Sequence, residues 1–207
     1  DMKRSEINAA LKEMEQMICD YRVALPPFCH FTPDDWKEKG HEYDEIRDNM
    51  LGWDITDYGL GKFEEVGFSL ITLRNGNLKM QDKYKKTYAE KLLYIKESQY
   101  SPMHFHWNKM EDIINRGGGN LIVKVYNCGE NEELADTPVE VTCDGRKYTV
   151  PAGAEIRLKP GESITLPPYQ YHAFWGEKGF GKVLIGEVSM VNDDNTDNRF
   201  YETQGRF

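Results

Sequence analysis

The sequence predicts a mainly β protein, an antiparallel sandwich or barrel, that begins with a helical segment. Many short strand-like stretches follow one another after residue 61, with turn signals every ~8–12 residues. The first 60 residues instead place apolar side chains at helical spacing. Hydrophobic content of 39% with 12% aromatics is typical of a folded globular chain, and 207 residues can bury one sizeable core.

The helical segment begins with residues 5–21, whose apolar positions line one helix face after Ser5 as the expected N-cap. The following "LPPF" ends this helix, because proline cannot continue it. A second short helix starts after a Thr32 cap, with proline at its first position. We expect residues 1–60 to form a helical cap packed on a barrel of residues 61–207, in one compact unit.

The strand predictions rest on alternating or short apolar runs bounded by turn residues. Asn75-Gly76 is a turn signal after the first strand, and Asp144-Gly145 is the expected tip of a hairpin. The stretches that predict strands are "KFEEVGFSLITLR", "YAEKLLYI", "NLIVKVYN", "VEVTCDGRKYTV", "AEIRLKPGESITLPP" and "GKVLIGEVSMV".

Charge and apolar runs exclude several classes of partner. A net charge of −9 argues against nucleic acid or an anionic membrane, because both demand a basic face. No run approaches the ~18 apolar residues of a membrane span, and the N-terminal stretch lacks the apolar core of a signal peptide. The four cysteines show no CxxC spacing and are expected to be free thiols. We therefore expect a cytoplasmic protein.

Three of the five histidines suggest a metal site. His104 and His106 are two residues apart, so on a strand their side chains project to the same face. Glu111 follows at an odd offset and joins them only if the strand bends or ends after His106. His172, which comes after a strand and a Pro-Pro break, is the expected third imidazole. Three imidazoles and one carboxylate suit Mn, Fe, Co, Ni or Zn.

Two stretches resemble the motifs of the cupin superfamily. "HFHWNKMEDIINRGG" resembles the first motif and "GESITLPPYQYH" resembles the second. The matching positions are His104, His106, Glu111 and Gly118 in the first motif, and Gly161, Pro167 and His172 in the second. Tyr169 replaces the usual glycine, and Gly176 stands where asparagine often ends the motif. The resemblance implies a cupin jelly-roll barrel, in agreement with the strand pattern.

Longer strings point to a narrower family. "PMHFHWNKMEDIINRGGGNL" and "GEVSMVNDDNTDNRFYE" are similar to the D-lyxose isomerase family of cupin sugar isomerases. This resemblance implies interconversion of D-lyxose with D-xylulose and of D-mannose with D-fructose, using a divalent metal ion, usually manganese. It also implies a small-molecule sugar as substrate, with Asp193, Asp194 and Arg199 as sugar contacts. Gln99, just before the HxH strand, is a further candidate contact. By composition alone, "VNDDNTDNRF" is equally a plain turn.

Aldose–ketose isomerisation needs a group that moves a proton between neighbouring carbons, and Lys109 and Glu187 are the candidates. Lys109 lies between two expected ligands, where a dication would lower the pKa of its ammonium. Glu187 interrupts the apolar strand "LIGEVSMV", where a carboxylate is either paired or functional. For both residues, a structural ion pair is the alternative interpretation.

Two other functions stay open at this point. One is a metal cupin that acts as a dioxygenase or decarboxylase, since three histidines and a glutamate occur there too; the proton-exchange candidates argue against it. The other is a sugar-binding cupin without turnover, which the presence of both Lys109 and Glu187 disfavours. Cupins often pair through their sheets, so a homodimer is expected.

Overall fold

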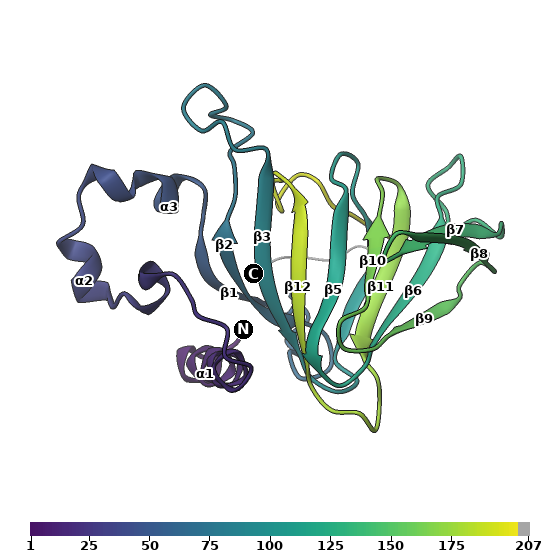
Figure 1. The fold of residues 1–207 in the computed structure, drawn as a ribbon, viewed down its shortest axis with the longest axis horizontal. Helices are drawn as coiled ribbons and strands as arrows, with labels where there is room; N and C mark the ends of the chain where they lie inside the picture. The colour runs from purple at the N-terminus through teal and green to yellow at the C-terminus, as the bar shows by residue number, and fades with distance from the viewer. Residues whose placement is uncertain (203–207) are drawn as a thin grey trace.

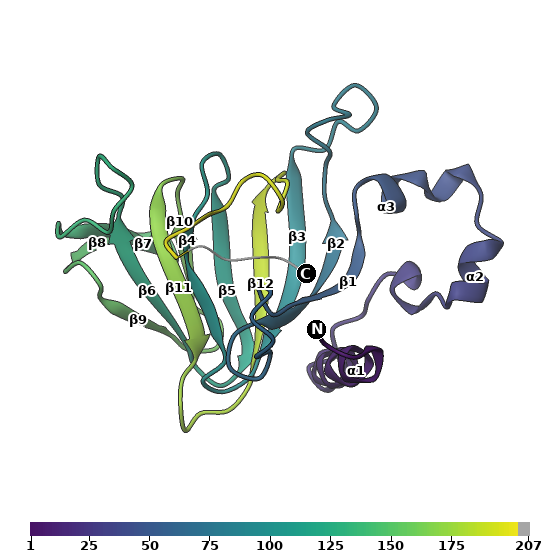
Figure 2. The ribbon, with the colours of Figure 1, turned by 180° about the vertical axis from the view of Figure 1, so that it is seen from behind.

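The computed structural model describes residues 1–202 and has two antiparallel β-sheets, with helices on one side (Figures 1 and 2). The larger sheet has eight strands, in the spatial order β1 (Gly52–Thr56), β2 (Phe68–Arg74), β3 (Tyr88–Ile95), β12 (Val183–Met190), β5 (Glu111–Gly118), β10 (Ser163–Leu166), β7 (Val139–Cys143) and β8 (Arg146–Val150). The smaller sheet has five, in the order β13 (Arg199–Phe200), β4 (Tyr100–Phe105), β11 (Gln170–Gly176), β6 (Leu121–Asn127) and β9 (Glu155–Leu158). The predicted fold class, a mainly β jelly-roll barrel with a helical start, is confirmed.

The core lies between the two sheets, and strand alternation decides which side chains enter it. In β5, Glu111, Ile113 and Asn115 are buried, whereas the residues between them are half-buried. The rest of this layer is almost wholly aliphatic, including Val123, Ile164 and Ile185. Full burial of each such side chain contributes about 1.5–3 kcal/mol to folding. Glu111 therefore occupies an inward register position next to an apolar core.

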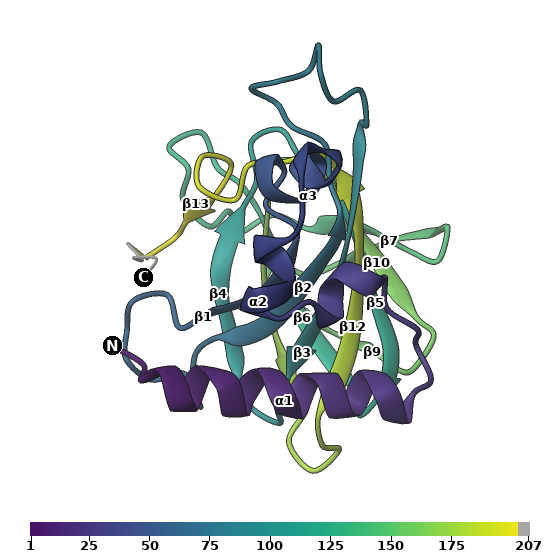
Figure 3. The same ribbon diagram turned by 90° about the vertical axis from the view of Figure 1, so that its left-hand side faces the viewer.

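Helix α1 (Arg4–Asp20) packs on the outer face of the larger sheet (Figure 3). Its apolar face, which includes Met14, Met17 and Ile18, lies in one buried cluster with residues of β2, β3 and β12. The 3₁₀ turns Pro27–His30 and His41–Tyr43 and the short helices α2 (Pro33–Lys37) and α3 (Asp44–Asp48) complete the segment. No helix within residues 1–202 is both long enough and apolar enough to cross a bilayer.

The helix caps are partly as predicted. The Thr32 side chain accepts a hydrogen bond from the Asp35 N–H at 3.1 Å, which confirms the expected cap of α2. The predicted Ser5 cap is wrong, because α1 begins one residue earlier, after Lys3. There the Glu6 carboxylate accepts the N–H of Lys3, so a residue inside the first turn satisfies the free donor.

One boundary differs from the sequence predictions. Strand β1 falls inside residues 1–60, so the larger sheet begins before residue 61. Its sequence, "GWDIT", is short and opens with glycine, and pairing with β2 rather than local propensity makes it a strand. Asn75-Gly76 directly follows the end of β2 at Arg74, and β3 begins at Tyr88. The Asp144-Gly145 tip is confirmed, with both residues at positive φ.

Candidate active site

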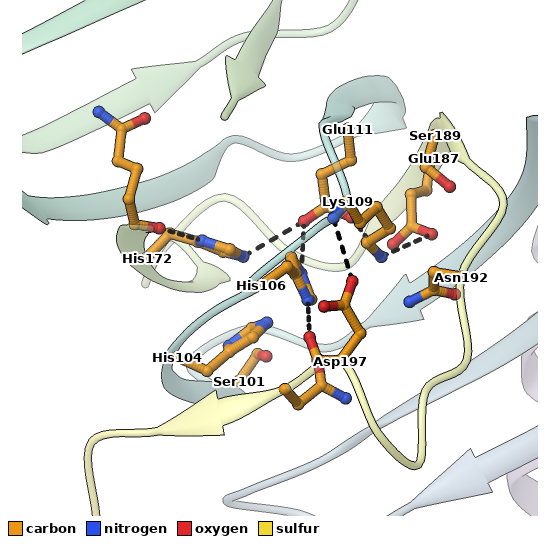
Figure 4. Close-up of polar contacts among 12 residues, drawn as sticks. Ser101, His104, His106, Lys109, Glu111, His172, Glu187, Ser189, Asn192 and Asp197 are labelled. Atoms are coloured by element: carbon orange, nitrogen blue, oxygen red, sulfur yellow. Dashed lines mark hydrogen bonds and ion pairs between the residues drawn. The ribbon is translucent and has the colours of Figure 1, made fainter. Parts of the chain in front are cut away.

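Three imidazoles converge inside the barrel (Figure 4). Strands β4 and β11 are antiparallel neighbours, and His104 lies directly opposite His172 in their register. His106 follows two residues later, on the same face as His104. One ring nitrogen from each of the three histidines lies within 4.8 Å of the others, and all three side chains are buried. The sequence prediction that His172 joins the HxH pair is confirmed.

Hydrogen bonds from Nδ1 orient each of the three rings. Each Nδ1 lies against a main-chain carbonyl oxygen: His104 against Pro102 at 2.8 Å, His106 against Asp197 at 2.9 Å and His172 against Gln170 at 3.0 Å. A carbonyl only accepts, so each Nδ1 carries a proton, and in a neutral ring Nε2 then keeps a lone pair. Burial, together with neighbouring imidazoles, lowers the pKa of both His104 and His172. The rings of His104 and His172 are therefore neutral and able to ligate a metal.

Glu111 joins the imidazoles because the chain turns after β4. Strand β4 ends at Phe105 and β5 begins at Glu111, which is the bend that the odd offset required. Its Oε1 lies 3.1 Å from His106 Nε2 and 3.2 Å from His172 Nε2. Burial opposes ionisation, but the neighbouring ammonium of Lys109 outweighs it and holds the pKa of Glu111 well below its usual range. The residue is therefore a carboxylate.

The donor set fits a divalent cation. In neutral rings that are protonated on Nδ1, the contacts of Glu111 Oε1 with two Nε2 atoms join lone pairs, which repel unless a cation lies between them. The Nε2 of His172 is also buried without a hydrogen-bond partner. Neighbouring donors on a six-coordinate ion with bonds near 2.1 Å lie about 3 Å apart, close to the separations of Glu111 from His106 and His172. Nitrogen and carboxylate donors together suit Mn, Fe, Co, Ni or Zn.

A row of alternating charges begins at this cluster, and Figure 4 shows its first three members, Glu111, Lys109 and Glu187. Lys109 Nζ lies 2.8 Å from Glu111 Oε2 and 3.6 Å from Glu187 Oε2. Lys91 Nζ in turn lies 3.7 Å from Glu187 Oε2 and 2.9 Å from Asp194 Oδ2. Removing one member of such a buried row leaves its neighbour uncompensated, which typically costs about 3–5 kcal/mol. Both candidates for proton transfer, Lys109 and Glu187, belong to this row.

The pKa values of both proton-transfer candidates, Glu187 and Lys109, are raised. Burial raises the pKa of Glu187 above its usual value, and Glu111 adds to the rise although Lys109 opposes it. The pKa of Lys109 is also raised: burial would lower it, but the carboxylates of Glu111 and Glu187 outweigh burial. The fall expected from the sequence refers to a bound dication, whereas this rise comes from the carboxylates of the protein itself.

Lys91 is a buried residue of the cavity that the sequence analysis did not identify as a candidate. It lies in β3 directly opposite Glu187 of β12 and is 5% exposed. A lysine inside the apolar stretch "YAEKLLYI" is the same signal that singled out Glu187. Applied to every strand, that signal would have found both members of the pair.

The structure brings one of the predicted sugar contacts to the cavity. Asp194 lines it, through the ion pair with Lys91. Asp193 lines only an adjoining cavity, which Asp194 also lines, and its Oδ2 lies 3.5 Å from Lys79 Nζ. Arg199 is paired with Glu132 at 2.8 Å and does not line the cavity beside the histidines.

Gln99 does not line the cavity either, and its amide is already used. The side chain is fully buried, its oxygen accepts the Lys96 N–H at 2.9 Å, and its NH₂ donates to the Phe63 carbonyl. A side chain that closes its own turn in this way has no free group for a hydroxyl. The position before the HxH strand therefore serves the fold in this structure.

The cavity beside the histidines has a mixed polar and apolar lining. Its volume is about 350 Å³, within the range of small-molecule sites. Polar groups come from His104, His106, Lys109, Glu187 and Asp194. The apolar lining comes from Phe68, Leu70, Leu93, Phe174 and Phe200. A sugar, which carries both hydroxyls and C–H faces, suits such a mixed lining.

The two departures from the cupin motif have local explanations. Tyr169 adopts the left-handed backbone of the glycine it replaces, with φ 63°, a conformation that costs about 1–2 kcal/mol for other residues. Its N–H donates to the His106 carbonyl at 2.9 Å, and its ring lies 5.2 Å from that of Phe105. At Gly176, a Cβ would lie 2.7 Å from the Lys96 carbonyl oxygen, which excludes asparagine there.

Comparison with known proteins places the chain in a family. The D-lyxose isomerase family matches residues 2–207. The D-lyxose/D-mannose isomerases of Serratia proteamaculans and Escherichia coli O157:H7 are 50% and 49% identical to it, over 100% of this chain and 90% and 91% of those proteins. The L-ribose isomerase structure from Geodermatophilus obscurus shares the fold, with a TM-score of 0.63 at 14% identity over 98% of this chain and 94% of that chain. The chain therefore belongs to the D-lyxose isomerase family, a family of sugar isomerases.

Proposed function

We propose that the protein is a metal-dependent aldose–ketose isomerase that interconverts D-lyxose with D-xylulose and D-mannose with D-fructose. The observation that carries the proposal is the buried pair Lys109 and Glu187 beside a cluster of three imidazoles and a carboxylate. The two relatives that are about half identical over the whole chain are D-lyxose/D-mannose isomerases, which supports the same sugars. We place the reaction in the cytoplasm, as the sequence leads us to expect.

Four residues would hold the ion: His104, His106, Glu111 and His172. When bound, a divalent ion, with Mn as the expected one and Zn, Co, Fe or Ni as alternatives, supplies Lewis-acid polarisation of sugar oxygens. Glu187 removes the proton from the carbon beside the carbonyl and returns it to the neighbouring carbon, through an enediol. Its raised pKa suits this double role, since a group must both take and give the proton.

Lys109 completes the proton balance. When hydrogen moves between carbons, a second proton must move between the two oxygens, and the ammonium of Lys109 is the nearest cationic donor to Glu187, at 3.6 Å. Its ion pair with Glu111 holds it beside the proposed ligands. Lys109 and Glu187 are both buried, which strengthens the interaction between their charges.

The proposal is tested with protein loaded with Mn²⁺ and mixed with a panel of pentoses and hexoses, followed by sugar analysis. We expect D-xylulose from D-lyxose and D-fructose from D-mannose. Oxygen uptake or release of carbon dioxide without ketose formation would favour a dioxygenase or decarboxylase instead. Sugar binding without any product would favour a non-catalytic cupin.

Replacement of Lys109 by methionine is expected to lower kcat far more than it raises KM, because methionine fills the space but holds no proton. Steady-state kinetics with D-lyxose measure both constants. Lys147→Met is the matched control, since Lys147 also pairs with a glutamate, at 3.6 Å, but on the exposed face of the sheet. A raised KM with unchanged kcat would show that Lys109 only anchors a sugar oxygen.

We also predict a homodimer formed through the larger sheet. Helix α1 covers one part of its outer face, but Tyr88, Val188 and Met190 of β3 and β12 remain about half exposed. Tyr88 and Met190 are direct neighbours in the register, so these side chains form one apolar patch. Light scattering should give twice the 24.0 kDa chain mass for the wild type and a smaller mass for Val188→Glu.

The control for this prediction is Phe180→Glu, since Phe180 is equally exposed but lies in a loop outside the patch. It should leave the mass of the assembly unchanged. A wild-type mass of one chain at working concentration would contradict the predicted dimer.

A further inference from the structure

The segment between β12 and β13 crosses the open end of the barrel, from the larger sheet to the edge of the smaller one (Figure 2, yellow). It carries Asp197, which is 3% exposed although it lies in a loop. We propose that Asp197 is a positioning residue that fixes both His106 as a metal ligand and Lys109 as a proton-transfer group. This inference rests on the proposed function, because it assigns a support to that same site.

The first contact orients the imidazole. The main-chain carbonyl of Asp197 accepts the Nδ1–H of His106 at 2.9 Å. This bond selects the tautomer with a free Nε2 and sets the angle of the ring toward the cluster (Figure 4). The other two histidines use carbonyls two residues away on their own strands, so only His106 depends on a distant segment.

The second set of contacts shapes the turn that carries Lys109. One carboxylate oxygen of Asp197 accepts the Asn108 N–H at 3.0 Å and the Asn108 side-chain NH₂ at 3.3 Å. The other accepts the Lys109 N–H at 3.0 Å. Both main-chain donors lie between β4 and β5, where no strand partner is present to receive them. The carboxylate thereby supplies the acceptors that a neighbouring strand would otherwise provide.

Contacts on both sides of Asp197 in the sequence fix the position of its main chain. Its N–H donates to the Asp193 carbonyl at 3.0 Å, closing a tight turn. Two residues later Arg199 pairs with Phe105 of β4. On the other side, the Lys91–Asp194 ion pair ties the same segment to β3. The segment around Asp197 therefore connects the proposed metal ligand His106, the turn that carries Lys109 and both sheets.

The test compares two variants with two matched controls. Asp197→Ala removes both side-chain acceptors, and Asp197→Asn keeps one of them in the same volume. Asp57→Ala and Asp57→Asn are the controls, because Asp57 is 2% exposed and its carboxylate also accepts two main-chain N–H groups, from Gly59 at 2.8 Å and Gly61 at 3.1 Å. Within residues 1–202, no hydrogen bond or ion pair joins Asp57 to the histidines or Lys109.

Two readouts are needed besides kinetics. Mn²⁺ affinity, from competition with a chelating dye, is expected to fall about 10–100-fold in Asp197→Ala, less in Asp197→Asn, and not at all in the Asp57 variants. Amide hydrogen exchange of the metal-free proteins should be faster at Asn108 and Lys109 in the Asp197 variants only. We expect kcat for D-lyxose to fall in the same order even at saturating Mn²⁺.

The possible failures are distinguishable. If the wild type binds no Mn²⁺, the proposed function fails, and the exchange at Asn108 and Lys109 still reports on the support of the turn. If the wild type binds Mn²⁺ and Asp197→Asn, which retains the volume and one acceptor, matches it in affinity, exchange and kcat, the role of Asp197 is overturned. An equal loss of affinity in the Asp57 variants would also overturn it, since the effect would then be general destabilisation.

Discussion

Replacing Glu187 with glutamine is expected to reduce turnover of D-lyxose by about 10²–10⁴-fold while metal binding stays intact. Glutamine keeps the size of the side chain and its place opposite Lys91, but it cannot take up the substrate proton. The effect is large because no other carboxylate replaces it: Asp194 is neutralised by Lys91, and Glu111 faces the imidazoles. Steady-state kinetics and metal analysis of the same preparation measure the two quantities together.

Glu140→Gln is the matched control for this variant. Glu140 lies on β7 of the same sheet but points outward, with its side chain 66% exposed beside Lys147. It should retain the turnover of the wild type. A Glu187→Gln protein with turnover within a few-fold of the wild type would show that another group carries the proton. Loss of the metal together with activity would make Glu187 a structural residue instead.

Replacing His106 with alanine is expected to remove metal and activity together. His106 Nε2 lies 3.1 Å from Glu111 Oε1, so both donors face the same point of the cluster. Loss of a ligand should weaken binding by more than the roughly 10–100-fold that loss of a supporting partner costs. Metal content after gel filtration, set against kcat/KM at low and at saturating Mn²⁺, measures the effect.

His30→Ala is the control for the metal experiment. His30 lies in the 3₁₀ turn Pro27–His30, with its side chain 55% exposed, and its recorded partner is Glu15 at 3.7 Å. It should bind metal like the wild type. Full metal content in His106→Ala would contradict the assignment of the ligand set.

The convergence of the histidines could be predicted because strand geometry is regular. The spacing of His104 and His106 fixes their common face, and the odd offset of Glu111 required a bend that the structure contains. Glu187 could be found because a carboxylate in an apolar strand needs a partner. In these cases the local sequence pattern alone determines the face of the strand to which each side chain points.

Other features depend on long-range pairing that local pattern does not contain. Nothing in "VNDDNTDNRF" distinguishes Asp197 from Asp193, yet one supports the turn before β5 and the other lines a neighbouring cavity. Strand β1 exists through its pairing with β2. Arg199 looked available for a sugar, but Glu132, far away in the sequence, neutralises it. In each case the deciding partner comes from a different part of the chain.

The central claim is that the isomerisation moves a proton through Glu187. Its most direct test is conversion of D-xylulose to D-lyxose in D₂O by the Mn²⁺-loaded protein, with the aldose analysed by NMR. A proton held on a carboxylate exchanges with solvent, so the account predicts D-lyxose that carries deuterium at C2. D-lyxose formed with no label at C2 would indicate an internal hydride shift and would contradict the role given to Glu187.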